Sequence, residues 1–228
     1  MTNPDPASPI AKFEAAIEAI SQKHYVIENA LDAVIMQFEN EIKPLVLAQA
    51  GGGIPERVLF CSPVTGKIET GANVFGLDWW DASPYGKQYG DKKHYHTGAD
   101  LNRPGYKDSG ANVYAAADGV IVFVGKVPEW QGDVVVIEHA LEDGSKVWTR
   151  YAHIHRSLSV VKDTPIKRGD VIGVIADYTP AGPQGDHLHY DVARIDLGDK
   201  PCDWPGLSLE RVRADYIDPV TWHKEMIK

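Results

Sequence analysis

The chain has 228 residues, of which 43% are hydrophobic and 24% are charged. That is the ordinary composition of a globular protein, and the length allows one domain with an appendage or two small domains. The formal net charge of −9 argues against a nucleic acid partner, because phosphate backbones are bound through basic patches. No stretch approaches the roughly 20 apolar residues of a membrane-spanning helix.

The first twenty residues show no secretory signal peptide, since they lack a basic start and an unbroken apolar run. We therefore expect the protein to be soluble as encoded.

A long amphipathic helix is predicted for the N-terminal segment. Ser8 is a suitable N-cap and Pro9 fits the first helical turn. Apolar residues then recur at alternating steps of three and four as far as Phe38, interrupted only by His24, and the pattern can run to about Lys43. Such a seam needs a partner: a second copy in a homodimer, a fold-back hairpin or the remaining domain. An ordinary amphipathic helix packed within one molecule is an equal alternative.

From residue 58 the pattern changes from helical to strand-like. Segments rich in β-branched and aromatic residues lie between turn signals at 58–61, 112–125, 132–140, 146–154, 171–176 and 187–195. We predict a coiled-coil-like helical segment over 1–50, a glycine-rich linker over 51–57, and a mainly β domain over 58–228. This domain is expected to be an antiparallel sheet with an open groove.

Turns and loops complete this domain. LEDGS at 141–145 should join two strands as a hairpin. The polar and aromatic stretch 76–95 and the segment 181–186 are expected to form opposite walls of the groove.

Three histidine-bearing segments lie in the β-patterned region: HTGAD at 96–100, YAH at 151–153 and HLH at 187–189. Alternate side chains of a strand share a face, so His187 and His189 should point into one cavity about 6–7 Å apart. His96 and Asp100 would be about 13 Å apart in an extended chain. The chain must bend between them, and Gly98 permits this through unusual backbone angles or a close neighbour.

These segments hold enough imidazole and carboxylate for one zinc site. A catalytic zinc ion takes three protein ligands and leaves a position for water, whose pKa it lowers to about 7. Two histidines and one aspartate meet that requirement, and a further pair of imidazoles could take up the proton and stabilise an oxyanion. A single one of the nine histidines would more simply be a surface or core residue; the constellation carries the prediction.

The same segments resemble the lysostaphin-type (LytM-type) zinc peptidases, which cut peptide bonds in bacterial peptidoglycan. The family's H-x-G-x-D, Y-A-H and H-L-H segments are matched by His96, Gly98, Asp100, Tyr151, Ala152, His153, His187, Leu188 and His189. Flanks at 113–125, 136–139, 167–173 and 215–222 are also similar, so the resemblance covers roughly residues 58–222. The chain departs from the family at Asp186, where proline is expected.

The resemblance implies a zinc ion bound by His96, Asp100 and His189, with His153 and His187 in acid–base and electrostatic roles. It also implies a zinc-dependent endopeptidase that hydrolyses peptide cross-links of peptidoglycan. The enzyme would reach the cell wall by a phage-type or other release route, because no export signal is visible. An inactive relative that binds the wall or regulates another hydrolase is the alternative.

Other residues near the motifs have simpler interpretations. A rim position is predicted for His94 and a structural role for His139. Asp186 could orient His187 or alter substrate choice, and it is equally well interpreted as a solvated turn residue. Cys61 and Cys202 have no close metal-binding partner, and free thiols are favoured over a disulfide.

Overall fold

The computed structural model describes residues 59–89, 94–105, 108–128, 130–177 and 185–226. These residues belong to the second of two units into which the chain divides, Gly53–Lys228. The predicted helical segment 1–50, the linker 51–57 and residues 181–184 of the predicted groove wall lie outside the described residues. Within the described ranges, no helix has the length and apolar character needed to cross a membrane.

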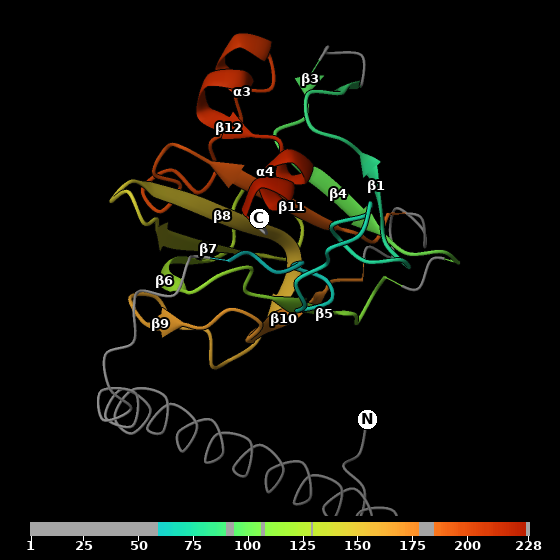
Figure 1. The fold of residues 1–228 in the computed structure, drawn as a ribbon, viewed down its shortest axis with the longest axis vertical. Coiled ribbons are helices and arrows are strands. Elements are labelled where there is room, and N and C mark those ends of the chain that lie inside the picture. The colour runs from blue at the N-terminus through green and yellow to red at the C-terminus, as the bar shows by residue number, and fades with distance from the viewer. Residues whose placement is uncertain (1–58, 90–93, 106–107, 129, 178–184, 227–228) are drawn as a thin grey trace, which may run out of the picture. The chain divides into compact units, whose positions relative to one another are not determined.

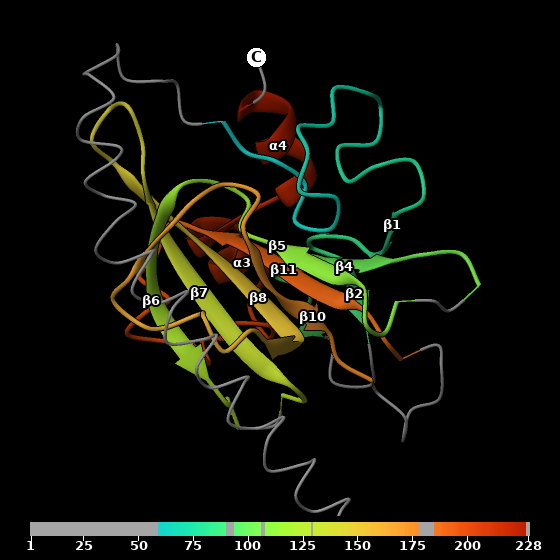
Figure 2. The ribbon, with the colours of Figure 1, turned by 90° about the horizontal axis from the view of Figure 1, so that it is seen from below.

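The domain is built on a large antiparallel sheet (Figure 1). Its main path comprises, in spatial order, β1 (Trp80–Ser83), β4 (Ala99–Asn102), β11 (Leu188–Ala193), β8 (Lys146–Arg156), β7 (Asp133–Ala140), β6 (Gly119–Gly125) and β9 (Pro165–Ile166). Figure 2 shows most of this order across the sheet, from β6 to β1. The predicted antiparallel β fold is confirmed.

Shorter elements extend the sheet at its sides. β10 (Val171–Ile175) pairs with both β8 and β5 (Asn112–Tyr114), and β12 (Tyr216–Ile217) pairs with β11. β2 (Gln88–Tyr89) and β3 (His94–Tyr95) form a separate two-stranded sheet. Two helices, α3 (Leu209–Asp215) and α4 (Pro219–Met226), follow near the C-terminus.

Most of the predicted strands are present. The segments 132–140, 146–154, 171–176 and 187–195 correspond to β7, β8, β10 and β11. The segment 112–125 is divided into β5 and β6, because the chain between them bonds elsewhere: the N–H of Ala116 donates to the hydroxyl of Tyr151 at 2.8 Å. The predicted hairpin is confirmed by a 2.9 Å bond from Leu141 N to Ser145 O.

The predicted strand at 58–61 is wrong for its described residues, 59–61, which form no strand. Phe60 and Cys61 are buried, and the N–H of Cys61 donates to Ala116 O at 2.7 Å. The apolar run therefore reflects burial beneath neighbouring segments, which hydrophobicity alone does not distinguish from a strand.

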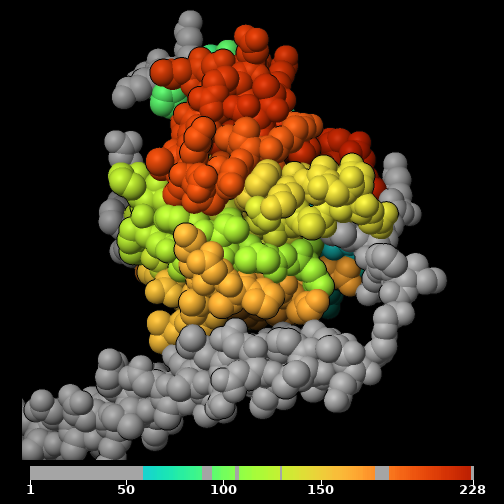
Figure 3. Space-filling model, turned by 90° about the vertical axis from the view of Figure 1, so that its left-hand side faces the viewer, coloured from blue at the N-terminus to red at the C-terminus, as the bar shows by residue number. Residues whose placement is uncertain are grey.

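The sheet is covered on both faces by apolar side chains. Along β7, Val135 and Ile137 belong to the larger core cluster, whereas Val134 and Val136 belong to a smaller cluster on the opposite face. Figure 3 shows one side of the domain, where β6 (green) lies between the segment around residue 163 (light orange) and the loop after β11 (orange). Burial on both faces explains the nearly continuous apolar sequence of β7.

The alternation of β11 decides which side chains reach the candidate site. Leu188, Tyr190 and Val192 are fully buried in the larger cluster, and Ala193 lies in the smaller one. Because successive residues face opposite sides, His189 shares the face of the smaller cluster. The prediction that Leu188 and Tyr190 point into the layer opposite His189 is confirmed.

Candidate metal centre and its histidines

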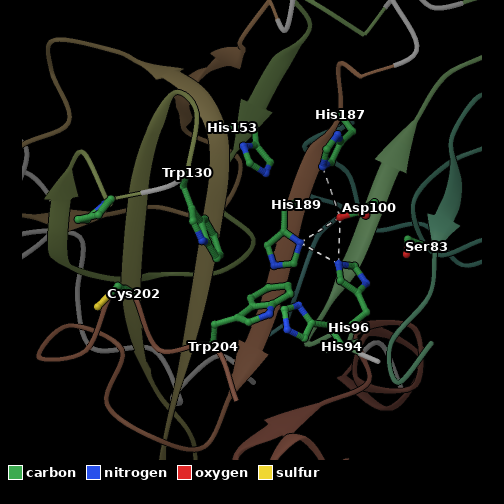
Figure 4. Close-up of a pocket in the computed structure, with 11 residues that line it drawn as sticks. Ser83, His94, His96, Asp100, Trp130, His153, His187, His189, Cys202 and Trp204 are labelled. Carbon is green, nitrogen blue, oxygen red and sulfur yellow. Dashed lines mark hydrogen bonds and ion pairs between the residues drawn. The ribbon is translucent and has the colours of Figure 1, made fainter. Parts of the chain in front are cut away.

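A pocket of about 740 Å³ lies over the face of the sheet that carries His189. Figure 4 shows its histidines gathered around Asp100, with two tryptophans nearby. The pocket is lined by Ser83, His94, His96, Asp100, Pro128, Trp130, His153, His187, His189, Cys202 and Trp204. All five of the predicted site residues are among them.

Three of these side chains direct one ligand atom each toward a common point. Nε2 of His96 lies 3.0 Å from Nδ1 of His189, and Oδ1 of Asp100 lies 3.1 Å from the first nitrogen and 3.0 Å from the second. Zinc with four ligands at about 2.0–2.1 Å places neighbouring ligand atoms roughly 3.3 Å apart. The observed triangle is only a few tenths of an ångström smaller, so the three residues fit a zinc ion.

The bend before Asp100 depends on a close approach at Gly98. β4 begins at Ala99, and its register sets Asp100 opposite His189. A Cβ atom on Gly98 would overlap the carbonyl oxygen of Tyr190 and lie 2.6 Å from Oδ1 of Asp191. Of the two predicted reasons for glycine here, the close neighbour therefore applies, and Gly98 is absent from the described glycines with positive φ.

The ligand triangle attracts positive charge. Although burial opposes its ionisation, hydrogen bonds with His189 and His96 hold the pKa of Asp100 well below its usual range. Burial by itself would lower the pKa of His189, but the Asp191 and Asp100 carboxylates outweigh that effect and raise the pKa to about 9. A bound metal ion would supply the positive charge that these two carboxylates attract.

His153 occupies an irregular position in β8. The β7–β8 register shifts between Asp133 and Val135, and His153 has a φ of 62°, a conformation uncommon outside glycine. Its Nδ1 donates a hydrogen bond to Gln131 O at 2.9 Å. Burial, reinforced by neighbouring His187 and His189, lowers the pKa of His153 to about 3. The imidazole is therefore neutral, with its lone pair on Nε2.

His187 lies just before β11 and faces both His153 and the ligand triangle. Its ring centroid is 4.7 Å from that of His153, and its Nε2 is 3.6 Å from Oδ1 of Asp100. The Nδ1 of His187 donates to Gly185 O at 2.7 Å. The structure thus brings two further imidazoles beside the three candidate ligands, one from β8 and one from the residue just before β11.

The other residues singled out in the sequence lie as follows. His94 lines the pocket, consistent with a rim position, whereas His139 is fully buried. The interpretation of Asp186 as a solvated turn residue is wrong, since the residue is only 5% exposed and its carbonyl accepts from Asn102 Nδ2 at 2.9 Å. Cys61 is buried, Cys202 is exposed, and both are free thiols.

Four functional candidates escaped the sequence analysis: Trp130, Trp204, Arg150 and Asp191. The two tryptophans line the pocket, while Asp191 and Arg150 form a buried ion pair beneath it. Asp191 could have been found, because it follows His189 by two residues on the same strand face. No local signal identifies the other three.

The segment of the chain that contains this site matches a known protein family. Residues 94–203 match the family model described as peptidase family M23. The search of curated protein sequences found no match.

Several solved structures are similar at low identity. Lysostaphin from Staphylococcus simulans, an antimicrobial peptidase, is 20% identical with a TM-score of 0.44, and the match covers 65% of this chain and 50% of that one. The catalytic domain of the prophage-encoded M23 protein EnpA from Enterococcus faecalis is 23% identical with a TM-score of 0.42, over 64% and 92%. Csd3 from Helicobacter pylori is 22% identical with a TM-score of 0.40, over 60% and 32%. The chain thus spans half of lysostaphin and a third of Csd3.

Proposed function

We propose that this protein is a zinc-dependent endopeptidase that hydrolyses the peptide cross-links of bacterial peptidoglycan, and the match of residues 94–203 to the model of peptidase family M23 supports this. One observation carries the proposal: three ligand atoms of His96, Asp100 and His189 converge within 3.0–3.1 Å, beside two further imidazoles.

In this proposal the metal is held by Nε2 of His96, Oδ1 of Asp100 and Nδ1 of His189. Zinc, when bound, lowers the pKa of a water ligand to about 7 and polarises a carbonyl group. The positions of two ligands follow from the paired strands β4 and β11, which set Asp100 opposite His189.

Proton transfer falls to His153. Its neutral ring, with hydrogen on Nδ1 toward Gln131 O, can accept a proton at Nε2 from the attacking water and later deliver it to the leaving amine. His187, with its Nδ1 tied to Gly185 O, can donate from Nε2 to the oxygen that gains charge in the tetrahedral intermediate. Since the two rings are 4.7 Å apart, both can reach the same scissile bond.

The groove rather than long-range attraction would provide affinity for the wall. With a formal charge of −9, the chain is not drawn electrostatically to anionic cell-wall polymers. Trp130 and Trp204 offer apolar walls beside the metal position, against which a peptide strand can pack.

The test is digestion of purified peptidoglycan of two kinds, one cross-linked through glycine bridges and one through direct D-alanyl bonds. Mass analysis of the released fragments identifies the bond cut, with chelator-treated protein before and after zinc addition as the control. We expect zinc-dependent fragments from one of the two substrates. Zinc-loaded protein that binds wall but releases no fragments from either would refute the proposal and indicate an inactive, wall-binding relative.

A further inference from the structure

Arg150 lies at the centre of β8, beneath the pocket, and is completely buried. Its Nε and Nη2 lie 2.7 Å and 2.6 Å from a single oxygen, Oδ2 of Asp191. Its Nη1 donates to the carbonyl oxygens of Pro201 at 3.0 Å and Asp203 at 2.9 Å. A buried guanidinium is costly unless it is paired in this way, so its contacts indicate a role that an apolar side chain would not fill.

The first connection runs from Arg150 to a candidate zinc ligand. The oxygen of Asp191 that faces Arg150 also lies 2.9 Å from Nε2 of His189. A carboxylate oxygen only accepts hydrogen bonds, so the hydrogen of a neutral His189 is held on Nε2 and the lone pair on Nδ1. Nδ1 is the atom that faces His96 and Asp100.

The second connection runs to the proton-transfer histidine. The guanidinium carbon of Arg150 lies 4.6 Å from the ring centroid of Trp130, within cation–π range. Trp130 in turn stacks on His153 with centroids 5.8 Å apart and an interplanar angle of 25°. Because the positive φ of His153 takes its side chain out of the regular strand pattern, this stacking helps to set the direction of the ring.

The third connection runs to the wall formed by Trp204. The carbonyl groups that accept from Nη1 of Arg150 belong to Pro201 and Asp203, which lie in the segment leading to Trp204. The Trp204 ring lies 5.5 Å from that of His189 and also 5.5 Å from that of Trp130. The guanidinium of Arg150 therefore contacts three groups at the pocket: the Asp191 carboxylate that bonds His189, the Trp130 ring, and the carbonyl groups of the segment that leads to Trp204.

We propose that Arg150 is a positioning residue that holds the zinc ligand His189 and the proton-transfer residue His153 in register, through Asp191 and Trp130. The roles of the two histidines rest on the proposed function. Lysine cannot replace arginine in this position, because a single ammonium group lacks the planar fork that serves the carboxylate, the two carbonyls and the indole ring together.

The test compares Arg150→Lys with Arg156→Lys, a control at a half-buried arginine on the same strand. The side chain of Arg156 donates to Val160 O at 3.3 Å, and its backbone N–H donates to Asp133 Oδ2 at 3.3 Å. Zinc affinity is measured by chelator competition, and kcat and KM on peptidoglycan fragments. We expect Arg150→Lys to bind zinc about 10- to 100-fold more weakly. Its kcat should fall by a larger factor than its KM rises, whereas the control should behave as wild type.

Two further measurements do not depend on the folding of Arg150→Lys. The double variant Arg150→Met/Asp191→Asn removes both buried charges and should show the same loss of zinc affinity. Nitrogen-15 spectra of the zinc-loaded wild-type protein should show His189 with hydrogen on Nε2 and metal on Nδ1. Metal on Nε2 of His189 would overturn the proposal.

The decisive contrary result is a folded Arg150→Lys or double variant that melts at a lower temperature yet binds zinc as wild type and keeps the nuclear Overhauser contacts between Trp130 and His153. Arg150 would then be a structural residue only. Failure of the peptidase function is a separate outcome: wild-type protein would leave peptidoglycan uncut while the Arg150 variants still lost zinc affinity, which supports the positioning role.

Discussion

The buried imidazole of His139 should make the protein lose stability on mild acidification. Its Nδ1 lies 2.8 Å from Asp118 O and its Nε2 lies 2.8 Å from Thr149 Oγ1, in a fully buried site. Burial lowers the pKa of this histidine from 6.5 to about 4. In the unfolded chain the ring is exposed and takes up a proton below about pH 6.5.

The sign and size of the effect follow from these two values. Between about pH 6.5 and pH 4 the unfolded state binds one more proton at His139 than the native state does, so the free energy of unfolding falls as the pH falls. The difference between 6.5 and about 4, at about 1.4 kcal/mol for each pKa unit, amounts in full to about 3 kcal/mol. Acidification from pH 7 to pH 5 should remove about 2 kcal/mol of it.

The assay is urea unfolding of wild type and His139→Gln at pH 7 and pH 5, with metal removed by a chelator. Glutamine keeps an amide beside Thr149 but does not titrate, so every other titrating group cancels in the comparison. We expect the stability difference between wild type and variant to shift by about 2 kcal/mol in favour of the variant at pH 5. An unchanged difference at the two pH values would refute the assigned pKa and the burial argument behind it.

Four further outcomes are expected. His189→Ala should release zinc, because two remaining ligands hold the ion poorly, and elemental analysis that finds tightly held stoichiometric zinc would contradict the ligand set. His153→Ala should keep its zinc but lose on the order of 100- to 10,000-fold in rate, and loss of the metal instead would show that its role is misassigned. Gly98→Ala should weaken both zinc binding and thermal stability, since its Cβ collides with β11; an unchanged melting temperature counts against this. If the predicted N-terminal seam pairs with a second copy and does not pack within one molecule, sedimentation should show a dimer for the full chain and a monomer for a chain starting at Gly51; two monomers would exclude self-association.

The family resemblance implied which five residues form the candidate site, and backbone geometry predicted the orientation of some of them. Strand alternation alone separates His189 from Leu188 and Tyr190, and the structure buries the latter two in the opposite core. A bend at Gly98 was required by the length of an extended chain, whatever surrounds it. These inferences succeed because they depend on backbone geometry over five residues or fewer.

The residues that support the site could be identified only from the tertiary structure. Arg150 looks in sequence like one more strand residue, yet its partners Asp191, Pro201 and Asp203 lie 41, 51 and 53 positions away. The positive φ of His153 likewise arises where β7 and β8 shift register, and nothing in the letters YAH encodes it.

The local sequence pattern therefore indicates which side chains of this protein could act in the site. The pairing of the strands determines which buried residues hold those side chains in place. A strand's own residues fix the alternation of its side chains, but the neighbours that pair with it decide which charges are buried together. The cost of burying Arg150 and Asp191 is offset only when β8 and β11 lie side by side, and that pairing is a property of the whole sheet.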